Sequence, residues 1–109
     1  MTPTTTVPFT ITDEAVELLR ELGYQKEFDQ IVEQLKQFVP GLLNIRARVM
    51  TMYDEGNRQD VLIECDMLNR HLEDEPISRE WGMLYSSLYP SAVRERIGVL
   101  IYFGGSDAR

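Results

Sequence analysis

The sequence predicts an α+β domain with the element order ααββαβ, in which helices cover one face of a three-stranded mixed sheet. Three observations support this prediction. Apolar residues recur at spacings of three and four over residues 13–22 and 24–39, which is typical of amphipathic helices. Apolar and polar residues alternate over residues 43–67, which indicates a β-hairpin. Residues 97–103 form a β-rich apolar run before a glycine pair, which indicates a third strand.

We expect the rest of the chain to fold around the hairpin. In both of its strands the odd-numbered positions are mainly apolar. Residues of equal parity must therefore face one another if the apolar side chains are to share one face of the sheet. The turn between the strands contains Gly56 and Asn57, two residue types that tolerate positive φ.

The expected register has a five-residue loop over residues 54–58, because this register sets opposite charges against each other across the ladder. Each such pair contributes about 0.2–1 kcal/mol. The main alternative is a shift by two residues, which sets Arg48 against Asp66 and Met50 against Glu64. The facing pairs of the expected register are Arg48 with Glu64, Arg46 with Asp66, Met50 with Leu62, Val49 with Ile63, Ala47 with Cys65, and Ile45 with Met67.

The first two helices have recognisable boundaries. Thr12 is a suitable N-cap for the first helix, and Gly23 is a suitable residue to end it. The second helix follows almost immediately over residues 24–39, and Pro40-Gly41 is expected to end it.

The third helix is expected to begin near Pro76, which suits a first helical turn, and to bury Trp81. Gly82 inside this helix costs up to about 1 kcal/mol relative to Ala. We therefore expect Gly82 to pack closely against another backbone, at Gly98 or in the second helix. A short helical turn over residues 92–96 is expected before the last strand.

The connection through the third helix predicts the sheet topology. A right-handed crossover makes the last strand parallel to the second strand of the hairpin, and we expect the first strand of the hairpin at the centre of the sheet. The threonine- and proline-rich residues 1–10 are expected to form an extended arm, residues 11–105 a single domain, and residues 106–109 a tail.

Composition narrows the range of partners. The 109 residues carry a formal net charge of −7, which argues against a surface that binds nucleic-acid phosphates. One cysteine excludes an internal disulfide, and no apolar run approaches the ~20 residues of a membrane span. The chain does not begin with a signal-peptide pattern. We therefore expect a cytoplasmic protein that binds neither nucleic acid nor membrane and holds no cofactor or metal.

The even-numbered face of the sheet is the candidate interface. If helices cover the odd-numbered face, the other face carries both charged and apolar side chains. We expect the apolar ones to form a contiguous patch for a second copy or another protein, with the charged ones setting orientation. An ordinary solvated sheet face is the simpler alternative. The residues are Arg46, Arg48, Met50, Met52, Leu62, Glu64, Asp66, Leu100 and Tyr102.

A second surface is the acidic side of the first two helices. Such residues are usually only solvated, but they also suit an inhibitor or antitoxin-like protein that binds a basic partner. The residues are Asp13, Glu14, Glu17, Glu21, Glu27, Asp29 and Glu33.

Evidence for catalysis or metal binding is weaker. A small hydrolase or metal-binding protein would use Glu64, Asp66 and His71, but Arg46 and Arg48 account for the two carboxylates as ion pairs. The sequence contains no spaced histidine pair, EF-hand pattern or HExxH motif. We assign no catalytic residue, and we expect a small protein-binding or assembly domain that forms a homodimer through its open sheet face.

Overall fold

The computed structural model describes residues 7–38, 42–67 and 74–103. The elements within these ranges are β1 (Phe9–Ile11), α1 (Asp13–Leu22), α2 (Gln25–Phe38), β2 (Leu42–Met52), the 3-10 helix η1 (Tyr53–Glu55), β3 (Arg58–Met67), α3 (Asp74–Leu88), α4 (Ser91–Arg96) and β4 (Ile97–Phe103). The expected α+β class is confirmed, and so are the helices and the three expected strands.

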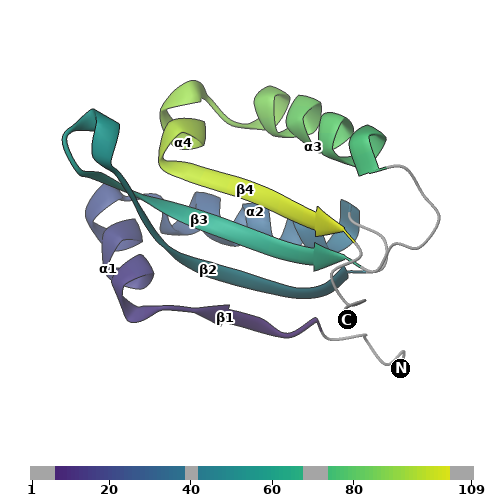
Figure 1. Ribbon diagram of the computed structural model, residues 1–109, viewed down its shortest axis with the longest axis horizontal. Coiled ribbons are helices and arrows are strands. Elements are labelled where there is room, and N and C mark those ends of the chain that lie inside the picture. Colours follow the sequence, from purple (N-terminus) through teal and green to yellow (C-terminus); the bar gives the residue numbers. More distant parts are fainter. Residues whose placement is uncertain (1–6, 39–41, 68–73, 104–109) are drawn as a thin grey trace.

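The four described strands form one mixed sheet in the order β1-β2-β3-β4 (Figure 1). β1 is parallel to β2, β2 is antiparallel to β3, and β3 is parallel to β4. The expectation of three strands is therefore wrong, because residues 9–11 pair with β2 instead of forming the end of a separate arm. A strand of three residues is too short to show an alternation of apolar and polar residues.

The crossover prediction is half confirmed. β4 is parallel to β3, as expected. The expected central place of β2, between β3 and β4, is wrong, because β4 pairs with β3. After β3 the chain passes through α3 and α4 and returns as β4, which pairs with the edge of β3 that faces away from β2. β1 pairs with the edge of β2 that faces away from β3.

From Asn44 onward the hairpin keeps the expected parity but not the expected register, and an irregularity between Leu42 and Asn44 sets Leu42 opposite Met67. Arg46 faces Glu64 and Arg48 faces Leu62, which differs by two residues from the expected pairing. The observed register also differs from the alternative that sets Arg48 against Asp66, because that alternative shifts β3 by two residues in the opposite direction. The loop contains five residues, 53–57, because η1 is followed by Gly56 and Asn57 at φ values of 72° and 63°. Facing opposite charges therefore do not set the register of this hairpin.

The predicted boundaries of α1 are confirmed. The Thr12 side chain accepts a hydrogen bond from the Ala15 amide over 3.2 Å, and Gly23 ends the helix at φ 77°. The Thr12 amide also donates to the Ala47 carbonyl over 3.2 Å. This cap therefore fixes the end of β1 and the start of α1 against β2. The expected stop at Pro40-Gly41 lies outside the described residues.

The core lies between the helices and the odd-numbered face of the sheet. Figure 1 shows α1 and α2 behind the sheet, and their buried side chains form one cluster with those of the strands and α3. Ile31, Ile45 and Ile63 are completely buried, and burial of each such side chain contributes about 1.5–3 kcal/mol. No described helix has the length and apolar composition of a membrane span.

A column of aromatic rings attaches α3 to this core. Trp81 is 4% exposed, with ring centroids 5.7 Å from Phe38 and 5.5 Å from Tyr85. The Tyr85 hydroxyl donates to the Ile97 carbonyl over 2.6 Å, which connects α3 to the start of β4. The prediction that Trp81 is a core residue is confirmed.

The expected close packing of Gly82 is wrong. Outside its chain neighbours and the backbone of its own helix, a methyl group placed on Gly82 would meet no described atom within 4 Å, and Gly82 is exposed. Gly98 is in ordinary contact with Leu62 instead. Gly82 therefore lowers the stability of α3 relative to alanine, and no close contact in the structure requires a glycine there.

Substitution Gly82→Ala is expected to raise the free energy of unfolding by about 0.5–1 kcal/mol, because alanine restricts the unfolded chain and favours the helix. Thermal and urea unfolding measure this change. Gly23→Ala is the matched control and should be destabilising, because Gly23 has positive φ. A lower stability of Gly82→Ala would show that the helix is packed more closely there.

Candidate interaction surface

The open face of the sheet is the even-numbered face, which points away from the helices. It points toward the reader in Figure 1. The nine residues of the predicted interface all lie on β2, β3 or β4 at even-numbered positions, and parity places them on this face. The structure therefore brings them to one surface, but it does not give them equal roles.

Glu64 is the centre of one ionic cluster on this face, and only 7% of the residue is exposed. Arg48 donates from Nε to Glu64 Oε1 over 3.2 Å, and the Tyr102 hydroxyl donates to Oε2 over 3.0 Å. Arg46 Nε lies 3.8 Å from Glu64 Oε1, and Arg46 also forms an ion pair with Asp66. Because the partners lie on β2 and β4, Glu64 connects three strands.

The expected ion pairs form in spite of the different register. Arg48 faces Leu62 in the ladder and reaches Glu64 as a diagonal neighbour. Arg46 faces Glu64 and reaches Asp66 in the same way. Diagonal neighbours on one face remain within reach of long side chains. Complementary charge therefore identified the pairs correctly without identifying the register.

These contacts shift the pKa values of Arg46, Arg48 and Glu64 toward the charged forms and that of Tyr102 toward the neutral phenol. The hydrogen bond from Arg48 lowers the pKa of Glu64 and outweighs burial, which acts in the opposite direction. Hydrogen bonds to carboxylates raise the pKa of Arg46 and of Arg48. The hydrogen bond to Glu64 also raises the pKa of Tyr102. The two arginines and two carboxylates of the cluster therefore balance one another.

A second ionic cluster lies at the hairpin end of the same face. Asp60 is 3% exposed and accepts hydrogen bonds from Arg58 Nη2 over 3.0 Å and from Arg96 Nε over 2.7 Å. Sequence reasoning missed this cluster, although the equal parity of Arg58 and Asp60 places both on the open face. The contribution of Arg96 depends on the return of α4 to β3, which no local pattern indicates.

The apolar residues of the face differ in their position and exposure. Met50 faces Asp60, whereas Leu100 faces Glu64, so the two lie in different rows and on strands separated by β3. Leu62, between these rows, is only 4% exposed within a single chain. Leu100 and Tyr102 are 45% and 40% exposed. The apolar side chains of the open face therefore lie toward two opposite corners. The β4 corner, with Leu100 and Tyr102, is exposed, whereas the β2 corner, with Met50 and Met52, is half-buried.

The structure gives no support to the alternative metal or acid–base site. Both carboxylates are held by arginines, and His71 lies outside the described residues. The described ranges contain no group of three His, Cys, Asp or Glu side chains that could hold a metal ion. Burial raises the pKa of the Cys65 thiol to about 12, so this side chain is neutral near pH 7.

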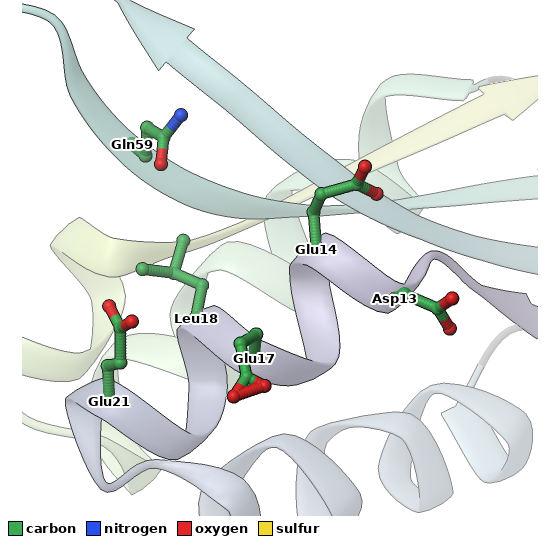
Figure 2. Close-up of a pocket in the computed structure, with 6 residues that line it drawn as sticks. All are labelled: Asp13, Glu14, Glu17, Leu18, Glu21 and Gln59. Atoms are coloured by element: carbon green, nitrogen blue, oxygen red, sulfur yellow. The ribbon is translucent and has the colours of Figure 1, made fainter.

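Acidic residues of α1 line a separate hollow of about 430 Å³ between this helix and β3. Figure 2 shows Leu18 pointing toward the strand that carries Gln59, with acidic side chains along the same helix. The expected acidic surface is nevertheless divided, because Asp29 of α2 lines a different hollow. The acidic side chains of the α1 hollow are Asp13, Glu14, Glu17 and Glu21.

Comparisons with protein-family models, with curated proteins and with solved structures find no match for this chain. The geometry of the described residues is therefore the basis for the functional argument.

Substitution Glu64→Gln is expected to lower the free energy of unfolding by about 1–2 kcal/mol at neutral pH, because the amide cannot keep the charge that its neighbours stabilise. The pKa of Glu64 is lower in the folded chain than in the unfolded chain. Its stabilising contribution is therefore complete above the unfolded pKa of about 4.3 and disappears as the pH falls through the folded value. Urea unfolding across this pH range should show a smaller acid-induced loss for the variant.

Glu17→Gln is the matched control. Glu17 pairs with Arg20 on α1, and both side chains are more than half exposed. Loss of the Glu17 charge should change the free energy of unfolding by less than about 0.5 kcal/mol. Equal effects of the two substitutions would contradict a special role for Glu64.

Proposed function

We propose that this chain is a small non-catalytic assembly domain that forms a homodimer through the open face of its sheet. The observation that carries the proposal is the position of Leu100 and Tyr102. Both side chains are large, apolar in the main and 40% exposed or more, and both lie on the face without helices. A small sheet commonly has its second face covered when that face carries apolar side chains.

The ionic clusters also favour burial of this face. Unpaired charges make an interface costly, because each loses its hydration without compensation. Here Glu64, Asp66 and Asp60 already have arginine partners within the same chain. A partner that covers the face would therefore leave none of these three carboxylates without a counterion.

A two-fold dimer would also bring the two apolar corners together. In an isologous interface, a contact between one residue and a second residue is repeated with the roles exchanged. The two-fold axis would lie between the two faces, perpendicular to the diagonal that joins the corners. Leu100 and Tyr102 of one copy would then lie on Met50 and Met52 of the other. Methionine adapts well to such surfaces.

Substitution Leu100→Asp is expected to convert a dimer into a monomer, because a carboxylate would be buried without a counterion. Light scattering across concentration, at low and high salt, measures the molar mass. Met50→Asp should have the same effect through the opposite corner. Circular dichroism should show unchanged helix content for both variants.

Met83→Asp is the matched control, since Met83 is 65% exposed on α3. This variant should keep the mass of the parent. A parent protein that is monomeric at every concentration and salt level would overturn the proposed homodimer.

The acidic hollow supports a second candidate function, the binding of a basic partner in the manner of an inhibitor. Four carboxylates on one helix raise the local concentration of cations through their combined field. Such binding should weaken steeply with salt and should not depend on the open face.

An oligolysine peptide tests this candidate. The double variant Glu14→Gln with Glu21→Gln should weaken peptide binding at low salt, measured by fluorescence anisotropy. The matched double variant on α2, Glu27→Gln with Glu33→Gln, removes the same charge away from the hollow. Equal losses for the two double variants would show only a response to net charge and would reject a specific site.

A further inference from the structure

The free edge of β1 carries backbone groups that suit an additional strand. Within the described sheet β1 is an edge strand whose neighbour is β2. The Pro8 carbonyl accepts from the Ile45 amide over 3.0 Å, and the Thr12 amide donates to Ala47. Because successive peptide groups along a strand point to opposite edges, the amide and carbonyl groups of Phe9 and Ile11 face away from β2. Figure 1 shows β1 at the lower border of the sheet.

An apolar groove lies directly beside this edge. It has a volume of about 240 Å³ and lies on the helix side of β1. Phe9 is 38% exposed, and its ring centroid lies 6.1 Å from that of Phe28, so the groove extends from the edge strand to α2. The side chains that form it include Phe9 and Ile11 of β1, Val16 and Leu19 of α1, and Phe28 and Asp29 of α2.

We propose that the β1 edge binds an extended peptide segment of a partner protein, which adds to the sheet as a fifth strand. Its backbone would exchange hydrogen bonds with Phe9 and Ile11. One apolar side chain of the peptide would enter the groove, and a basic side chain two residues away, on the same side of the strand, would approach Asp29. This recognition mode takes affinity from backbone hydrogen bonds and specificity from alternate side chains.

The pairing of an open edge with a groove favours an extended segment over other occupants. A helix or a small apolar molecule could fill part of the groove but would leave the outward groups of Phe9 and Ile11 without a strand partner. A second copy paired through β1 would meet across only three residues. The same three residues limit the ladder with a peptide, but the second copy's own strand, Phe9–Ile11, carries no basic side chain that could approach Asp29. This site is separate from the open face, so it does not depend on the proposed homodimer.

The test uses a fluorescent peptide of sequence Val-Thr-Phe-Thr-Lys-Thr-Val, in which the apolar and basic side chains lie on one side of a strand. Anisotropy titration of the full chain should show saturable binding. A control peptide, N-methylated at the amides that would donate to β1, should not bind, because it cannot form the ladder.

The variant Asp29→Lys should weaken binding of the lysine peptide by about tenfold or more, because a like charge replaces the opposite one. Replacing the peptide lysine by glutamate should restore binding to this variant. Asp54→Lys, in the exposed hairpin loop, is the matched control and should bind like the parent.

Absence of peptide binding, equal binding of the N-methylated peptide, or an Asp29→Lys variant that binds like the parent would overturn the proposal. A second copy is the occupant instead if the peptide does not bind and Phe9→Asp lowers the molar mass of the parent protein. The open-face substitution Leu100→Asp should leave peptide binding unchanged, so failure of either proposal can be recognised separately.

Discussion

The arrangement of the sheet depends on two carboxylates, Asp60 and Glu64, that are nearly buried on a face without helices. β3 lies between β2 and β4, so its side chains are enclosed by neighbours on both sides. A buried carboxylate is tolerated only when it is paired and hydrogen-bonded. Arginines from β2 and from the end of α4 provide these partners. The same interactions that satisfy the two carboxylates therefore link β3 to β2 and to the end of α4.

The paired charges also change what the open face is able to do. Long arginine side chains and Tyr102 surround Glu64, and Leu62 beside it is enclosed without a partner chain. The centre of the face is consequently polar and already satisfied, and its exposed apolar surface lies toward the corner formed by Leu100 and Tyr102. Such a surface can be covered by a partner with little electrostatic cost, but its specificity must come from the corners.

The two edge strands of the sheet, β1 and β4, limit pairing of their outward backbone groups with other chains in different ways. At the β4 edge, α3 lies nearby and Tyr85 binds the Ile97 carbonyl. At the β1 edge, the strand is only three residues long, which limits unwanted pairing. A short edge beside an apolar groove is nevertheless well suited to a selective extended ligand. The open face and the β1 edge are thus separate surfaces with separate physical requirements.

The sequence by itself determined the fold class, the helix caps at Thr12 and Gly23, and the face on which each hairpin residue lies. These features depend on local conformation and on the period of apolar residues. Tertiary structure alone decided the strand order, the two-residue difference in register, the addition of β1 and the approach of Arg96 to Asp60. Parity allows every register shifted by an even number of residues, and contacts across 36 positions in the chain leave no periodic signal.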